Sequence, residues 1–372
     1  MQSCRIIAGL LGLLLAGAAS AGEPTECDRL AGSPTDPNRV GAGIGLYGIE
    51  PAEAITACEK ALAADPHNPR LLFNLGRAHA ARGFVDKQSD QKTQAAQSFK
   101  GAADQGYPAA QGEVALFYWH GIGGFQRDAG QAIRLLEKAM VSDTKEAKPQ
   151  RRNLFADTTF TPDPNEAEIR IVKEAADAGD ADALYALSLP FNLGDDGKAE
   201  LADLLHKAAT LGSAPAALDL AKMYFRGEGG LAKNPEESLR LIQQAVAGDD
   251  PGTWFLAAIF YERGSFGVPK DEKLAARLFK QASDEGNAFA QYHLGTFYDE
   301  GGGGLPQDSR EAARLYKLAA DQGNDDAVLA LARDMAEGRG GYEADKAKAV
   351  AYLKHAARWS TQAKDELTKM GG

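Results

Sequence analysis

A short glycine-rich segment recurs along this 372-residue chain and constrains its fold more than any other feature. The five recognisable copies are GIGGFQRD, GEGGLAKN, GSFGVPKD, GGGGLPQD and GRGGYEAD, which begin at Gly121, Gly227, Gly264, Gly301 and Gly338. The last four begin 37 residues apart, and a weaker copy, GDDGKAE, begins at Gly194. A fixed period of this length indicates a repeat array, in which each unit packs mainly against its neighbours.

The residues around each copy predict two helices per period. Before the glycines, apolar residues recur seven and three positions upstream, as at Leu294 and Tyr298, and a small residue such as Gly295 follows the first of them. This spacing places the apolar pair on one helical face. After the glycines comes an Asp or Asn such as Asp308, a preferred N-cap. The second helix then ends before another glycine, such as Gly323, which is the expected C-terminal cap.

Each period therefore reads as a helix, a glycine-rich turn, a second helix and a short turn. One such hairpin cannot bury its own apolar face, whereas stacked copies can. The expected fold is all-α, an α-solenoid of roughly eight antiparallel helix pairs.

The pattern resembles the Sel1-like repeat family, which is related to the tetratricopeptide repeats. The copy AFAQYHLGTFYDEGGGGLPQDSREAARLYKLAADQG, at 288–323, carries the resemblance best. The likeness is strong over 216–357, fair over 107–140 and poor over 141–190, while Ala54–Gly83 looks closer to a tetratricopeptide repeat.

This resemblance implies a right-handed superhelix of helix pairs that binds proteins or peptides, and exported bacterial members of the family are common. Relatives with β-lactam-related activity place cysteines inside each repeat. This chain does not, so that activity is not implied here.

The first residues read as a secretory signal. Arg5 precedes an apolar stretch from Ile6 to Leu15, and Ala19-Ser20-Ala21 has the small-residue pattern of a cleavage site. A short amphipathic N-terminal helix is the alternative. We expect residues 1–21 to be removed and no membrane span to remain, so the protein would be exported to the periplasm or the outside of a bacterial cell.

The domain boundaries follow from these patterns: 1–21 signal, 22–64 disulfide-tied cap and first helix, 65–360 repeats, 361–372 tail. Within the cap, 22–50 is expected to be largely irregular. The repeats are weakest at 141–190, where Pro190 would interrupt a helix because it lacks a backbone donor.

Two cysteines, Cys27 and Cys58, remain after the signal. In an oxidising compartment an even pair is most simply a disulfide. On the loop-entropy model, this bond would contribute about 3–4 kcal/mol. A redox-active pair is the alternative, but no Cys-x-x-Cys spacing supports it.

The charge balance narrows the choice of partner. The chain has 41 Lys and Arg against 52 Asp and Glu, a formal net charge of −11. Such a chain repels polyphosphate, so no nucleic-acid partner is expected. A protein or peptide partner fits better, and a basic one is favoured over an acidic polymer.

Motifs for catalysis or cofactors are weak. GIGLYG, Gly43–Gly48, matches G-x-G-x-x-G, but a loop-like PTDPNRV precedes it instead of a buried strand, so a flexible linker is favoured over a dinucleotide site. Gly301–Gly304 lacks the Lys-Ser/Thr of a phosphate loop, and Asp308 and Glu311 in the following helix would repel phosphate. The chain has no H-x-x-x-H and no G-x-S-x-G. We therefore predict no catalytic, cofactor or metal site and no enzyme activity.

The first helix of each period is expected to line the concave face of the solenoid. Aromatic residues there that the repeat does not require are candidate partner contacts, because aromatics are enriched at binding hot spots. These candidates are Trp119, Phe225, Trp254 and Tyr292. Core packing is the alternative role for each of them.

The functional hypothesis is an exported scaffold that binds a protein or peptide partner without catalysis. Two alternatives stay open. One is a periplasmic regulatory subunit that restrains an envelope signalling protein. The other is a hydrolase that acts on cell-wall material.

Overall fold

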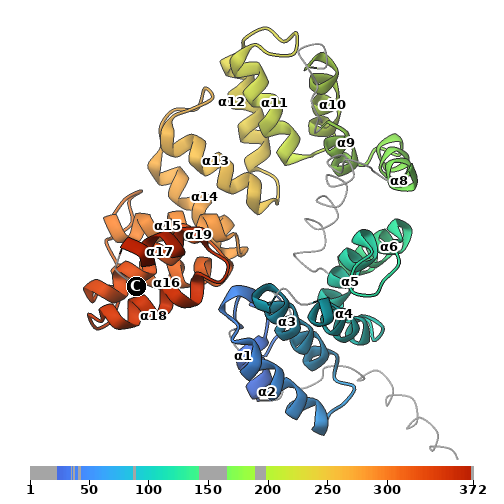
Figure 1. The fold of residues 1–372 in the computed structure, drawn as a ribbon. Coiled ribbons are helices and arrows are strands. Elements are labelled where there is room, and N and C mark those ends of the chain that lie inside the picture. The colour runs from blue at the N-terminus through green and yellow to red at the C-terminus, as the bar shows by residue number, and fades with distance from the viewer. Residues whose placement is uncertain are drawn as a thin grey trace, which may run out of the picture.

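The computed structural model describes residues 23–34, 36, 38–40, 43–86, 89–141, 166–188 and 198–369. Within these ranges every regular element is a helix, and the helices form the expected α-solenoid (Figure 1). The predicted signal sequence, Pro190 and most of the weak repeat segment lie outside the described residues.

The helices follow one another as antiparallel pairs, each packed on the next. Their bounds are α1 Glu26–Ala31, η1 Leu46–Gly48, α2 Pro51–Ala64, α3 Pro69–Asp86, α4 Ser89–Ala103, α5 Pro108–His120, α6 Ala129–Val141, α8 Glu166–Asp177, α9 Ala181–Ser188, α10 Lys198–Thr210, α11 Ala214–Arg226, α12 Pro235–Val246, α13 Pro251–Arg263, α14 Glu272–Asp284, α15 Ala288–Glu300, α16 Ser309–Ala320, α17 Asp325–Glu337, α18 Lys346–Ala356 and α19 Thr361–Lys369. The closest pairs are α3 with α4, α5 with α6, α11 with α12, α13 with α14, and α15 with α16.

The glycine-rich segments are the turns between paired helices, as predicted. Helix α15 ends at Glu300 and is followed by Gly301, whose φ of 74° lies in the left-handed region that favours glycine. The backbone N–H of Asp308 then donates to the carbonyl of Tyr298 at 2.7 Å. The Asp308 carboxylate accepts from the N–H groups of Arg310 and Glu311, which caps α16. Gly301–Gly304 is therefore a helix-to-helix turn.

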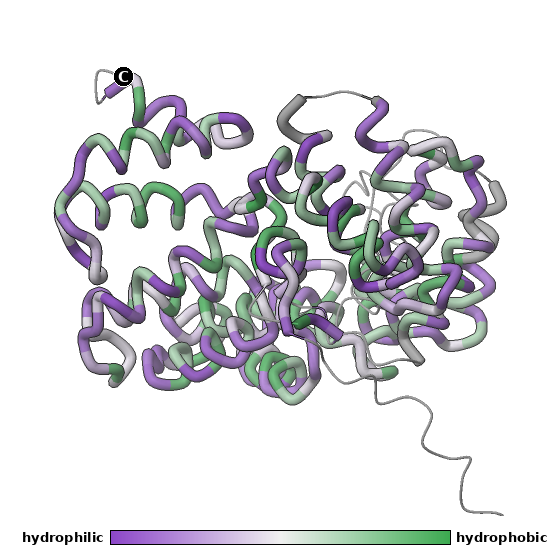
Figure 2. Tube along the Cα trace, turned by 90° about the horizontal axis from the view of Figure 1, so that it is seen from below, coloured by the Kyte–Doolittle hydropathy of each residue, from purple (hydrophilic) through white to green (hydrophobic). Residues whose placement is uncertain are grey.

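The apolar core is divided into clusters along the array. One cluster is built on Phe73, Phe99 and Trp119, a second on residues from α8 to α16, and a third on residues from α16 to α19. Each cluster joins consecutive helices, so the apolar face of every hairpin is covered mainly by its neighbours. Hydrophobic and hydrophilic residues alternate along the helices (Figure 2), and no helix in the described ranges is long and apolar enough to cross a bilayer.

The cap contains more helix than the sequence suggested. Residues 26–31 form α1 because Thr25 and Asp28 make a reciprocal capping box. The Thr25 hydroxyl accepts from the N–H of Asp28 at 3.2 Å, and the Asp28 carboxylate accepts from the N–H of Thr25 at 2.8 Å. At the other end, the expected polar tail forms α19, which buries Ala363 and is capped by Ser360.

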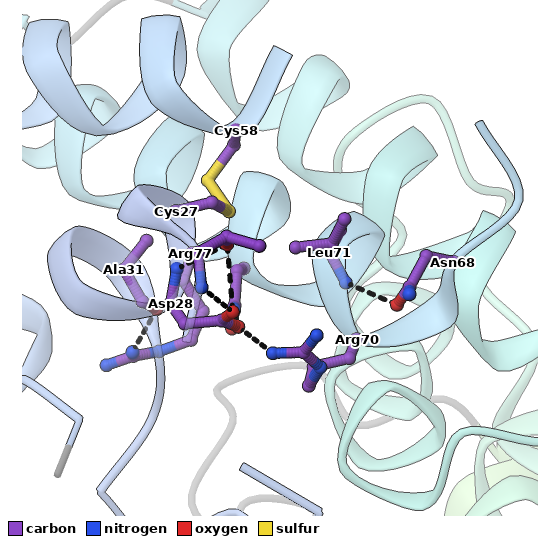
Figure 3. The surroundings of a disulfide bond; sticks show 10 residues. Cys27, Asp28, Ala31, Cys58, Asn68, Arg70, Leu71 and Arg77 are labelled. Carbon is purple, nitrogen blue, oxygen red and sulfur yellow. Dashed lines mark hydrogen bonds and ion pairs between the residues drawn. A yellow bond between two sulfur atoms is a disulfide. The ribbon is translucent and has the colours of Figure 1, made fainter. Parts of the chain in front are cut away.

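Cys27 of α1 and Cys58 of α2 are joined in a disulfide, and both side chains are fully buried (Figure 3). Beside it, the buried carboxylate of Asp28 accepts from the Asn74 amide at 3.0 Å and pairs with Arg70. The disulfide and these polar contacts tie α1 to α2 and α3.

The cap also lies against the last repeats, which closes the solenoid (Figure 1). The N–H of Tyr47 donates to the carbonyl of Asp321 at 3.0 Å, and the Tyr47 ring lies 5.5 Å from that of Trp359. Nδ1 of His355 lies 2.6 Å from the carboxylate of Glu50. We call these five residues the closing contact.

The closing contact corrects the expectation that Gly43–Gly48 is a flexible linker. A Cβ atom on Gly45 would lie 2.3 Å from the Asp321 carbonyl oxygen, and one on Gly48 would lie 2.6 Å from its carboxylate. Glycine is needed at position 45 because a side chain there would meet the backbone of Asp321, whereas the close contact at position 48 is with the Asp321 side chain. The G-x-G-x-x-G pattern thus reflects packing between distant parts of the chain.

Candidate protein-binding surface

Two of the four predicted contact residues are in the core. Trp119 is 1% exposed and Trp254 is 7% exposed. The indole N–H of Trp254 donates to the carbonyls of Val246 and Gly248 at 3.1 and 3.0 Å, which fixes the turn between α12 and α13. The burial of both rings leaves little surface for a partner, so the structure favours the packing role for these two tryptophans.

The other two predicted residues, Phe225 and Tyr292, are half-buried. The Tyr292 ring lies 5.7 Å from that of Tyr316 and 5.5 Å from that of His293. Burial raises the pKa of the Tyr292 phenol, and the carboxylate of Asp326 acts in the same direction. The phenol is therefore neutral at physiological pH, and a contact role for both residues stays a prediction.

The structure adds an exposed aromatic side chain that the sequence did not single out. Phe289, in the first turn of α15, is 59% exposed. Its ring lies 5.7 Å from that of Phe255 on α13, which is itself 5.6 Å from His293. We call Phe255, Phe289, Tyr292 and His293 the aromatic patch. The sequence position of Phe289 could have indicated this exposure, because Phe289 does not occupy the positions seven and three residues before the glycines, where the repeat packs its core.

His293 anchors the aromatic patch to the core. Its ring stacks on Phe279, with centroids 5.0 Å apart and planes 10° apart. Burial lowers the pKa of His293, Arg263 lowers it further, and Asp326 opposes this effect. The neutral imidazole is therefore favoured, and the patch presents uncharged rings to solvent.

A second aromatic group lies one repeat earlier and carries positive charge. The ring of Phe225, at the end of α11, lies 5.7 Å from that of Phe266, in the turn after α13. The Lys233 ammonium lies 5.5 Å from the centre of the Phe225 ring, and the Arg226 guanidinium lies 5.5 Å from that of Phe266. We call these four residues the basic–aromatic patch.

Neither patch is arranged for catalysis by a metal. Within the part of the chain that the structure describes, no group of three or more His, Cys, Asp or Glu side chains is placed to hold a metal ion. What both surfaces offer chemically is apolar and cation-bearing contact area of the kind that binds protein segments.

The stacked helix pairs, left-handed glycine turns and Asp or Asn caps define a helix-pair repeat protein. The family model of the Sel1 repeat matches five segments, residues 108–139, 214–250, 252–287, 288–324 and 326–358. The chain therefore contains five Sel1 repeats, which are related to the tetratricopeptide-type repeats.

Solved structures of similar proteins include other Sel1 repeat chains. A Sel1 repeat protein from Oxalobacter formigenes is 27% identical, covering 86% of this chain and 93% of that one, with a TM-score of 0.47. A protective antigen of uropathogenic Escherichia coli that displays an SLR fold is 23% identical, covering 85% of this chain and 67% of that one, with a TM-score of 0.43. Among curated proteins there is no significant match.

Proposed function

We propose that this protein is an exported scaffold that binds a protein or peptide partner through its aromatic patch, without catalysis. Sel1 repeat proteins typically serve as protein-interaction scaffolds. The observation that carries the proposal is the exposure of Phe289 beside the half-buried rings of Phe255 and Tyr292. A large exposed apolar ring on a rigid aromatic base is typical of a binding hot spot.

The energetics agree with this role. Burying a phenylalanine side chain stabilises a complex by about 1.5–3 kcal/mol relative to leaving it in water. Because Phe255 and His293 are already held by packing on Phe279, little side-chain entropy would be lost when a partner covers the patch.

Export is supported by two features of the chain. The N-terminal sequence has the charged, apolar and small-residue regions of a secretory signal. The disulfide between Cys27 and Cys58 is of a kind that persists in oxidising compartments.

The proposal is tested by placing a photo-crosslinking amino acid at position 289 and, as a matched control, at Leu211. Leu211 is 52% exposed and follows α10, away from the aromatic patch. We expect position 289 to crosslink one defined protein, and an excess of this chain without the crosslinking amino acid should compete with that product. Position 211 should give no crosslinked product. With the crosslinking amino acid placed at position 292 instead, the chain should form the same crosslinked product, and the added substitution Phe289→Ser should abolish it. Equal crosslinking from both positions would contradict the proposal.

A further inference from the structure

We infer that the basic–aromatic patch of Phe225, Arg226, Lys233 and Phe266 binds an acidic segment of a peptide partner, with the two cations taking its carboxylates. This inference deepens the proposed scaffold function and rests on it. It assigns to one repeat junction a ligand chemistry that the net charge of the chain does not suggest.

The two cations of this patch are held on aromatic faces. Arg226 and Lys233 are both exposed, and neither forms an ion pair with any residue that the structure describes. By contrast, Lys222 on the same helix is paired with Asp219 at 2.7 Å. Arg226 and Lys233 therefore keep positive charges that are available to a partner.

The next repeat arranges the equivalent lysine differently. Lys270 occupies the position equivalent to Lys233, and it pairs with Glu272 at 2.7 Å. Two residues after Lys233 the chain has Pro235 instead of an acid. The same turn thus neutralises its lysine in one repeat and leaves it available in the other.

The backbone at Phe266 is an independent sign of a built site. Phe266 has a φ of 55° and is the one described non-glycine residue with a positive φ. The other four turns have glycine at this position: Gly123, Gly229, Gly303 and Gly340. A side chain in this conformation is strained, and such strain gathers at functional sites.

The surroundings of Phe266 explain how the strain is tolerated. On α12, the Ser238 hydroxyl donates to the Phe266 carbonyl at 2.7 Å. The ring then packs on Phe260, with centroids 4.6 Å apart, and carries Arg226 on its face.

The net charge of −11 does not prevent an acidic ligand from binding here. At physiological salt the Debye length is about 8 Å, so exposed charges farther away are largely screened. A carboxylate between Arg226 and Lys233 is governed by the two nearby cations. A guanidinium also offers it two parallel donors.

The test titrates the full chain with a fluorescein-labelled decapeptide of alternating glutamate and alanine, followed by fluorescence anisotropy at about 0.15 M salt. Peptides with glutamine or lysine in place of glutamate provide the ligand controls. The variants are Arg226→Gln, Lys233→Gln and Phe266→Gly. Their matched controls are Arg263→Gln and Lys270→Gln, at the equivalent positions one repeat later.

We expect the glutamate peptide to bind more tightly than the glutamine peptide and the lysine peptide to bind most weakly. Arg226→Gln and Lys233→Gln should each weaken binding roughly three- to fivefold, while the two control variants change it less than twofold. Phe266→Gly should weaken binding while preserving the turn, because glycine is the residue of the other four turns.

Equal binding of the glutamate and glutamine peptides, tighter binding of the lysine peptide, or no binding of the glutamate peptide at millimolar protein would overturn the inference. So would an equal loss in the control variants. If the crosslink from position 289 persists in any of these cases, only the proposal of an acidic-ligand site is contradicted, and the proposed scaffold function is unaffected. If that crosslink is absent while the glutamate peptide binds as expected, the proposal that the aromatic patch binds the partner is contradicted instead.

Discussion

The ring of Tyr47, in the N-terminal cap, lies 5.5 Å from the indole of Trp359, behind the last repeat. The contact joins the two ends of a solenoid, whose units otherwise touch mainly their neighbours. A Cβ atom on Gly323 would lie 2.8 Å from the Tyr47 ring, so a glycine in the last repeats also makes room for it. The stability of the two ends is therefore coupled through the closing contact.

The coupling is tested by removing the Trp359 ring and observing the cap. In Trp359→Ala, the Tyr47 amide, which donates to Asp321, should exchange its hydrogen about two- to tenfold faster, because an aromatic pair contributes about 0.5–1.5 kcal/mol. Exchange of the Asn234 amide, bonded to Tyr224 in a distant turn, should not change. An unchanged rate at Tyr47 would show that the ends are independent.

The disulfide should stabilise the cap and, through it, the closing contact. Its loop spans a sequence separation of 31, for which the loop-entropy model gives about 3–4 kcal/mol. Reduction should therefore lower the melting temperature and speed exchange at Tyr47. The double variant Cys27→Ala and Cys58→Ala should be insensitive to reductant. Alkylation of the unreduced protein should leave Cys27 and Cys58 unlabelled, and labelling of both thiols would contradict the bond.

Stability should fall in mild acid because of His293. Burial lowers its pKa in the folded state below the ordinary value of 6.5, so the unfolded chain binds the proton more readily. The contribution of neutral His293 to the free energy of unfolding is complete above pH 6.5. It is lost as the pH falls through the lower pKa of the folded state. His293→Gln should remove this part of the pH dependence between about pH 7.5 and 5. Identical pH profiles of melting temperature for both proteins would show that His293 does not contribute.

The cap at Asp308 should support α16 by a modest and local amount. Asp308→Ala removes the acceptor of two backbone N–H groups and should cost about 1 kcal/mol. Asp308→Asn keeps an acceptor oxygen and should cost less. Hydrogen exchange of the Glu311 amide measures the effect directly, and equal protection in both variants would argue against the capping role.

Much of this fold was predictable because it is local. The glycine at each helix end and the N-cap residues such as Asp308 act within one turn of helix, so neighbouring residues suffice to predict each helix pair. The 37-residue recurrence then shows that the pair is repeated. Two short helices were not predicted. Helix α1 depends on the Thr25–Asp28 capping box, and α19 depends on burying Ala363 against the last repeat.

The contact residues were harder to predict, because a helical pattern does not distinguish a ring that packs from one that is exposed. Trp119 and Trp254 are unusual at their repeat positions, yet both fill the core. Phe289 looks ordinary in the sequence, yet most of its side chain faces solvent because α13 covers only one side of it.

The sequence by itself determined the repeat and its turns, since each depends on residues close together in the chain. Tertiary structure alone decided that Gly43–Gly48 packs on Asp321 and that Tyr47 meets Trp359. It also decided that Arg226 and Lys233 share an aromatic surface. These relationships depend on how successive helix pairs rotate, and that rotation accumulates from the packing of many side chains.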